Sequence, residues 1–169
     1  MEKEIKLRIQ IQPKDMHHFL VQQNYRSFSG IFGVICSLAA LVFLLLTYSS
    51  NTQSKNIILI LIAALFLVVQ PLQLKLVSIQ KVQTVPSFKE PLEYTLCEQG
   101  IKVQQKEEEA QMTWEDVRKI RETKKSIFIY TSPVSAFILP KEQYKEQLKT
   151  VKDIIKVHVK EDKCQWKKN

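Results

Sequence analysis

The side chains that most often carry chemistry are few in this chain, and they are scattered. Three cysteines stand far apart, at Cys36, Cys97 and Cys164, and no two of them have the spacing of a metal-binding or redox motif. His17 and His18 are adjacent, so on a helix they point about 100° apart and do not easily ligate one metal ion. We therefore expect unpaired thiols, surface histidines, no metal site and no cofactor.

Known catalytic motifs are also missing from the sequence. It contains no Walker loop and no GxGxxG, HExxH or GxSxG string, and three glycines in 169 residues leave little for a loop around phosphate. The acidic runs at 107–109 and 115–116 could form a metal or acid–base cluster, but a solvated hairpin tip and a turn cap explain them more simply. The sequence therefore predicts a protein that is not an enzyme.

The middle of the chain is nearly free of charge. The averages, 45% hydrophobic residues, a formal net charge of +8 and a mean hydropathy of -0.13, hide the fact that residues 30–74 contain one charged residue, Lys55. Two apolar runs, 30–48 and 57–76, are separated by eight polar residues. The first run would span roughly 28 Å as a helix, close to a hydrocarbon core of about 30 Å. The pair could form the core of a soluble protein, but it favours a transmembrane hairpin at 30–76, with Gln70 and Pro71 ending the second helix.

The basic residues predict the orientation of this hairpin. Five lysines and arginines precede it, one lies between the two runs, and nineteen follow if Lys75, next to the last residue of the second run, is included. By the positive-inside rule, both termini are expected in the cytoplasm, with the chain a multi-pass protein of the cell (inner) membrane. Neither run contains a charged residue within its apolar core, which argues against an ion-coupled transporter.

The two flanks of the hairpin predict one domain split by it. Residues 4–11 alternate between apolar and polar, as in a half-buried strand, and an amphipathic helix follows within 1–29. From residue 90 the pattern predicts about six short strands and then a helix from Lys141 to about His158, whose apolar stripe is Tyr144, Leu148, Val151 and Ile155. A lone apolar strand is unstable, so the first strand is expected to pair beyond the hairpin.

The predicted fold class is therefore an α+β membrane protein. A two-helix transmembrane hairpin is inserted in a small antiparallel β-barrel or sandwich, which the C-terminal helix closes. The predicted organisation is an N-terminal strand and helix at 1–29, the hairpin at 30–76, a cytoplasmic domain at 90–160 and a basic tail at 161–169. Within this domain Trp114 is expected in the core, and Trp166 could anchor the tail at the membrane interface.

An ordered set of short strings after the hairpin resembles the YcxB-like family of bacterial membrane proteins. In this chain the strings are YTLCEQGI at 94–101, TWEDV at 113–117, KI at 119–120, IFIY at 127–130 and FILPK at 137–141. The resemblance implies a membrane location and a cytoplasmic domain similar to a bacterial pleckstrin-homology (PH)-like domain. It carries over no catalytic residue and leaves the activity open.

The functional signal that remains is a ridge of lysines on the predicted C-terminal helix, at Lys145, Lys149, Lys152 and Lys156. Near an anionic leaflet each such residue contributes about 1 kcal/mol to membrane contact, although a merely solubilising surface is the simpler alternative. Nucleic acid is not an expected partner, because exposed stacking aromatics are not interleaved with the basic groups.

Two functions follow as expectations. In the first, the chain is a membrane-anchored, non-enzymatic interaction module of unknown biological role, YcxB-like, whose cytoplasmic domain binds a protein or anionic lipid. In the second, it is an accessory subunit of a membrane transport or signalling complex. The expected partners are the lipid bilayer and either another protein or a second copy of the chain.

Overall fold

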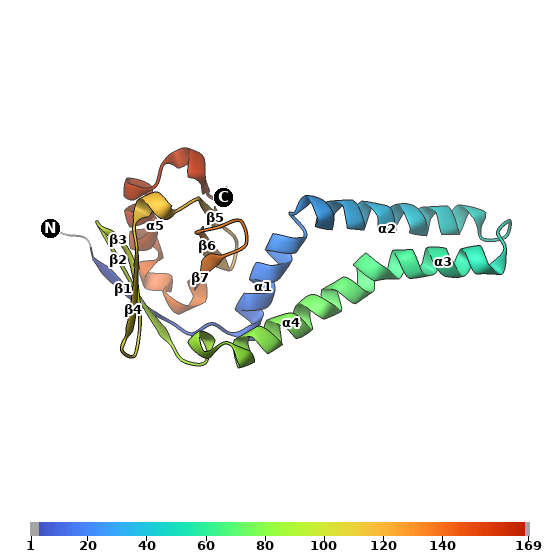
Figure 1. Ribbon diagram of the computed structural model, residues 1–169. Coiled ribbons are helices and arrows are strands. Elements are labelled where there is room, and N and C mark those ends of the chain that lie inside the picture. The colour runs from blue at the N-terminus through green and yellow to red at the C-terminus, as the bar shows by residue number, and fades with distance from the viewer. Residues whose placement is uncertain (1–3, 168–169) are drawn as a thin grey trace. The chain divides into compact units, whose positions relative to one another are not determined.

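The computed structural model describes residues 4–167, and the chain divides into two compact units (Figure 1). One unit combines the residues up to Met16 with those from Lys81 onward, and it holds all the strands of the described chain. The other unit, His17–Gln80, is helical. The structure is thus α+β, as the sequence predicts, and it contains two helical segments that are long and apolar enough to cross a membrane.

Sheet A joins the N-terminal strand to three strands that follow the helical unit. Its order is β1-β2-β3-β4, all antiparallel, with bounds β1 (Ile5–Ile9), β2 (Leu92–Cys97), β3 (Gly100–Gln105) and β4 (Glu108–Met112). The register places Leu7 opposite Tyr94, and Ile5, Leu7 and Ile9 are buried while their neighbours are exposed. The predicted pairing of the first strand across the hairpin is confirmed.

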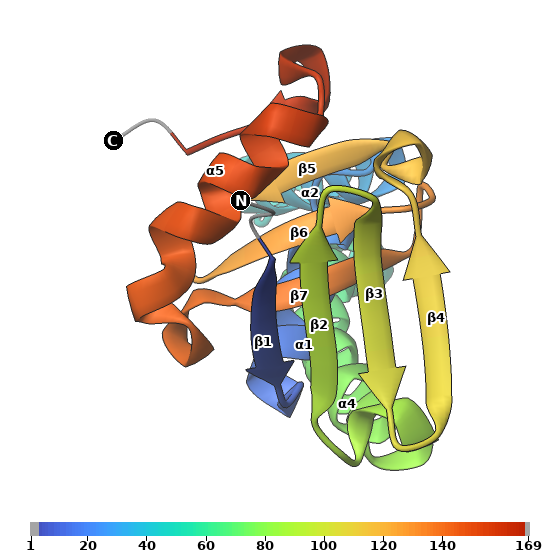
Figure 2. The same ribbon diagram turned by 90° about the vertical axis from the view of Figure 1, so that its left-hand side faces the viewer.

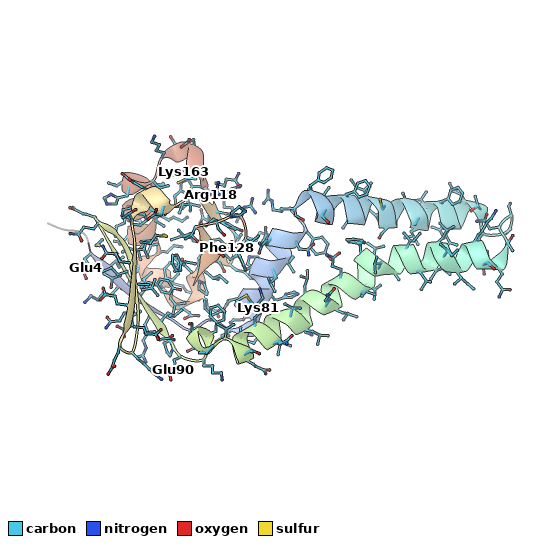
Figure 3. The ribbon with its side chains drawn as sticks, viewed as in Figure 1. Glu4, Lys81, Glu90, Arg118, Phe128 and Lys163 are labelled. Atoms are coloured by element: carbon cyan, nitrogen blue, oxygen red, sulfur yellow. The ribbon has the colours of Figure 1, made fainter. Side chains whose placement is uncertain are left out.

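Sheet B lies behind sheet A in the view of Figure 2, with its strands crossing those of sheet A. Its order is β7-β6-β5-β8, with bounds β5 (Lys119–Glu122), β6 (Ser126–Tyr130), β7 (Ala136–Pro140) and β8 (Cys164–Gln165). Every residue of β6 is buried, and Phe128 lies fully enclosed between the layers (Figure 3). Two crossed sheets with a shared apolar interior account for the strand-rich unit.

The strands do not close into a barrel, and they are not all antiparallel. Within residues 4–167, sheets A and B share no strand, and β8 runs parallel to β5. The turn between β4 and β5, η3 (Trp114–Asp116), explains the break. Asp116 accepts hydrogen bonds from the Thr113 amide at 3.2 Å and the Thr113 hydroxyl at 2.7 Å. This capping box redirects the chain after β4, so that β5 belongs to sheet B and does not extend sheet A.

The C-terminal helix is shorter than the sequence predicts. Two short 3₁₀ turns, η4 (Lys141–Gln143) and η5 (Lys145–Gln147), precede it, and α5 is Leu148–His158. Tyr144, with φ −140° and ψ 39°, separates the two turns and breaks the helical geometry. Figure 2 shows α5 beside the two sheets, and the helix buries Val151, Ile154 and Ile155. Trp114 is buried as predicted: its ring stacks on His158 at 5.4 Å and its Nε1 donates to the Cys97 carbonyl at 2.9 Å.

The helical unit contains two antiparallel apolar segments. The helices begin with α1 (Pro13–Asn24), which continues from the strand-rich unit, followed by α2 (Phe28–Thr47), α3 (Gln53–Ala64), η1 (Leu65–Val69) and α4 (Gln70–Thr84). A Cβ on Gly33 would lie 2.1 Å from the Phe66 ring, and the Ser37 hydroxyl donates to the Ile62 carbonyl at 2.9 Å. Small residues therefore allow α2 and α3 to approach closely.

The expectation that the second helix ends at Gln70 and Pro71 is wrong. The helical segment runs from Gln53 to Thr84 without interruption, because a π-helical turn before Pro71 accommodates the proline. In this turn the Gln70 amide donates to the Leu65 carbonyl, and Pro71 has no amide to offer the next carbonyl, that of Phe66. The Tyr25 hydroxyl lies 3.5 Å from the Phe66 oxygen, at the long limit of a hydrogen bond.

Candidate functional site

The four lysines predicted as one ridge occupy different environments. Lys145 belongs to η5, whereas Lys149, Lys152 and Lys156 lie on α5. Lys145, Lys149 and Lys156 are exposed, and Lys152 is partly buried. The four lysines therefore do not form one ridge, because α5 begins after Lys145 and because Lys152 is less exposed than the other three.

Lys152 is held inside the domain by Glu122. The carboxylate of Glu122, at the end of β5, is only 4% exposed. Its Oε1 atom accepts from Lys141 and, at 2.5 Å, from Lys152, while its Oε2 accepts from the Lys167 amide at 3.2 Å. Burial alone would raise the pKa of Glu122, but the hydrogen bonds from the two lysines outweigh burial and lower the pKa. Lys152 therefore serves the packing of the domain.

The residues after α5 fold back on the domain. Strand β8 pairs with β5, and the Lys163 ammonium donates to the Val117 carbonyl at 2.7 Å. The Trp166 ring lies 6.0 Å from the Lys152 ammonium and 5.7 Å from that of Lys156, within the range of cation–π attraction. Trp166, expected as an anchor at the membrane interface, thus contacts α5 of its own chain. Residues 168–169 of the predicted basic tail lie outside the described residues.

A basic groove of about 620 Å³ lies on the strand-rich unit. Its walls come from the first turn of α1, the β5–β6 turn, η4, η5 and the start of α5. Five lysines line it, together with two carboxylates and apolar wall residues that include Leu148; the lysines are Lys14, Lys124, Lys125, Lys141 and Lys145. We call this the basic groove below. Of the four predicted lysines, it contains Lys145 alone.

Two of the five lysines are already engaged. Lys14 forms a 3.0 Å ion pair with Glu142, which raises the pKa of Lys14 and lowers that of Glu142. Lys141 donates to Glu122 and, at 2.7 Å, to the Thr123 carbonyl. The remaining three, Lys124, Lys125 and Lys145, are exposed and have no salt-bridge partner among residues 4–167.

The second carboxylate of the groove, Asp15, has a structural role. Its side chain accepts a hydrogen bond from the Gln12 amide at 3.1 Å, at the start of α1. Asp15 is 7% exposed, and this burial raises its pKa. Five lysines and two carboxylates leave the groove with a net positive charge, and Lys124, Lys125 and Lys145 are its lysines without a salt-bridge partner among residues 4–167.

The acidic runs considered from the sequence serve turns and an edge strand. Glu107 lies in the β3–β4 turn, Glu108 and Glu109 are exposed on β4, and Asp116 caps η3. In the part of the chain that the structure describes, no three His, Cys, Asp or Glu residues gather as metal ligands. The three cysteines are free.

The basic groove was not predicted from the sequence because its residues are far apart in the chain. Lys14 is separated from Lys124 by the whole helical unit, and the Lys124-Lys125 pair is a common turn composition. The sequence feature that could have indicated the basic groove is the concentration of lysines at turns and helix starts, in place of a row of lysines along one helix.

Comparison with protein families matches residues 98–155 to the family described as YcxB-like protein. The matched part runs from the β2–β3 turn to most of α5, about a third of the chain, and contains four of the five groove lysines. This part of the chain is thus similar to the YcxB-like family, which supports the resemblance seen in the sequence. No curated protein and no solved structure matches the chain.

Proposed function

We propose that the chain is a membrane-anchored, non-enzymatic interaction module whose strand-rich unit binds anionic lipid headgroups. The helical unit supports the anchoring part of this proposal. Leu45, Leu46 and Leu61 are more than 60% exposed, and only 6% of the most apolar window of Gln53–Thr84 is buried within the chain. Exposing so large an apolar surface to water costs free energy, whereas contact of this surface with lipid does not.

The observation that carries the lipid-binding part is the set of three lysines in the basic groove without a salt-bridge partner. Lys124, Lys125 and Lys145 are exposed at one concave surface, and each lysine near an anionic headgroup contributes about 1 kcal/mol. Lys149 and Lys156 add exposed positive charge on α5. The proposed binding thus depends on surface charge and requires no chemical turnover.

The location proposed for this activity is the cytoplasmic face of a bacterial cell (inner) membrane, with both termini on that side. The distribution of basic residues supports this orientation, because the loop between α2 and α3 contains no Lys or Arg and the first turn of α3 only Lys55, whereas the strand-rich unit is rich in both. The proposal also includes a PH-like character of the exposed unit, which two crossed sheets and a C-terminal helix support.

A flotation experiment tests the proposed function. The full chain in nanodiscs of zwitterionic lipid is mixed with vesicles that contain phosphatidylglycerol or only phosphatidylcholine. We expect co-flotation with the anionic vesicles alone, weakened by added salt, because screening reduces the attraction of exposed charges. Replacing Lys124, Lys125 and Lys145 by Gln should reduce it several-fold.

The matched control replaces three exposed lysines outside the basic groove, Lys6, Lys89 and Lys160, by Gln. It removes the same net charge and should retain most of the binding. Equal flotation with neutral and anionic vesicles would reject the proposal. A stoichiometric protein crosslinked to the chain in native membranes would favour the accessory-subunit function, for which the exposed apolar faces of α2 and α3 offer a contact surface.

A further inference from the structure

We infer that the basic groove is a binding site for a phosphomonoester group and discriminates against phosphodiesters. This inference rests on the proposed function and specifies the ligand of the same site. The chemical class is a terminal phosphate, carried by a lipid headgroup or by a small soluble molecule.

Three lysines without a salt-bridge partner among residues 4–167 line the basic groove. Lys124 and Lys125 come from the β5–β6 turn and Lys145 from η5, so two separate segments present ammonium groups to one groove. A lysine ammonium offers three donors and no acceptor. Three such groups at a concave surface suit a ligand with several acceptor oxygens and more than one negative charge.

Ligands with one or two negative charges differ in how well they match three ammonium groups. A phosphomonoester carries about −1.5 to −2 charges near neutral pH and has three terminal oxygens. A phosphodiester in a lipid such as phosphatidylglycerol carries a single charge and has two free oxygens. A monoester therefore offers one terminal oxygen for each of the three lysines that line the groove, whereas a diester offers two.

The two carboxylates that line the same groove already have partners within the fold. Glu142 is neutralised by Lys14 at 3.0 Å, and Asp15 directs its side chain to the Gln12 amide. Both acids are thus satisfied within the fold. A phosphate ligand would meet unpaired ammonium groups without having to displace an existing ion pair.

The side chains of the groove favour binding over catalysis. The described lining residues are lysines, two acids, Pro140 and Leu148, with no cysteine, histidine or hydroxyl side chain among them. Such a groove can hold a phosphate by charge, and its two carboxylates, which could otherwise act as nucleophiles, are engaged by the Gln12 amide and by Lys14. The inference is therefore a binding site for the phosphate, which leaves the ligand chemically unchanged.

Calorimetric titration of the full chain in neutral detergent tests this inference. The probes are glycerol 3-phosphate, short-chain phosphatidic acid and short-chain phosphatidylglycerol, at low salt and near neutral pH. We expect the monoester lipid to bind about tenfold tighter than the diester lipid, because it has the additional charge. Glycerol 3-phosphate identifies the source: affinity equal to that of phosphatidic acid indicates a soluble ligand, and markedly weaker binding indicates a lipid.

Two variants make the test specific to the basic groove. The triple variant Lys124→Gln, Lys125→Gln, Lys145→Gln should lose monoester binding about tenfold or more, while Lys6→Gln, Lys89→Gln, Lys160→Gln should retain it. The replaced side chains are exposed, so folding is expected to persist; the single variant Lys145→Gln, with a smaller loss, provides a second test. Equal affinities for monoester and diester, or an unchanged triple variant, would overturn the inference. Flotation with phosphatidylglycerol vesicles would persist in that case if the proposed function holds.

Discussion

Glu122 shows how one buried carboxylate organises distant parts of the strand-rich unit. It accepts from Lys141 in η4, from Lys152 in α5 and from the backbone of Lys167, so three segments converge on β5. Taking the charges out of water costs free energy, and the arrangement is stable only while the carboxylate and its donors remain together. Lys152 was predicted as a lipid or partner contact, and in the structure its ammonium group pairs with this buried carboxylate.

The variant Glu122→Gln should lower the free energy of unfolding by about 2 kcal/mol. The loss is below that of a fully buried ion pair because the side chains of Lys141 and Lys152 are 14% and 28% exposed and can reach water. Chemical denaturation of the full chain in detergent, followed by tryptophan fluorescence, measures it. The control Glu146→Gln changes an exposed residue and should have little effect.

The same carboxylate also predicts a dependence on acid. Its folded pKa lies below the ordinary value of 4.5, so its contribution to stability is fully present above that pH and disappears as the pH falls through the folded pKa. The wild type should therefore lose part of its stability below about pH 4.5, and Glu122→Gln should show a smaller loss. Identical acid sensitivity of the two proteins would contradict this assignment.

At the scale of elements, small side chains and one irregular turn explain the packing of the helical unit. Gly33 permits α2 to contact the Phe66 ring in η1, and Ser37 bonds to the Ile62 carbonyl of α3. The π-helical turn allows the second segment to continue past Pro71 as α4. The local sequence predicted that the helix ends at Pro71, because proline usually ends a helix. The π turn that accommodates this proline is visible only in the structure.

Replacing Gly33 by Val should destabilise the α2–α3 contact by about 1–3 kcal/mol, because the new Cβ would overlap the Phe66 ring. The double variant Gly33→Val, Phe66→Ala should recover part of the loss, since the smaller side chain leaves room. Thermal unfolding in detergent, followed by helical circular dichroism, is the measurement. The control Leu46→Val lies at a position 79% exposed and should leave the midpoint nearly unchanged; an equal shift there would contradict the packing explanation.

At the scale of the whole molecule, the chain combines a strand-rich unit, made from both sides of the sequence, with an apolar helical unit between its two parts. β1 and β2 are neighbours in sheet A although 82 residues separate Ile9 from Leu92. The Gln10 amide and carbonyl bond to the side chain of Gln143, each at 2.9 Å, which further joins the N-terminal segment to the C-terminal half. Both ends of the described chain therefore belong to one folded unit.

This arrangement makes a topology prediction for the proposed membrane anchor. Reporters fused after Asn169 and inserted after Gln53 should lie on opposite sides of the membrane, the first one in the cytoplasm. A reporter inserted at Lys89 should agree with the one at the C-terminus, because Lys89 and the C-terminal residues belong to the same unit. Protease protection or a compartment-specific enzyme reporter measures this. Signals from one side at Gln53 and Asn169 would reject the hairpin topology.

The features that the sequence alone determined are those encoded by local periodicity. A strand or helix buries or exposes side chains with its own period. This period is visible in the alternation of Ile5, Leu7 and Ile9, in the two apolar runs, and in the stripe of Val151 and Ile155. The sequence also indicated that the first strand pairs beyond the apolar runs, because an apolar strand needs a partner and the remaining predicted strands all lie there. The structure identifies that partner as β2.

Only the tertiary structure decided how the lysines are used. The capping box at Thr113–Asp116 separates two sheets, which decides between the barrel and the sandwich that the sequence left open. β8 returns to β5 although its two paired residues carry no recognisable strand pattern. Lys152 turns inward to Glu122, while Lys145 joins Lys124 and Lys125 in the basic groove. Charged side chains are long and flexible, so their partners depend on which distant segments the packed core brings within reach, and no local repeat encodes that distance.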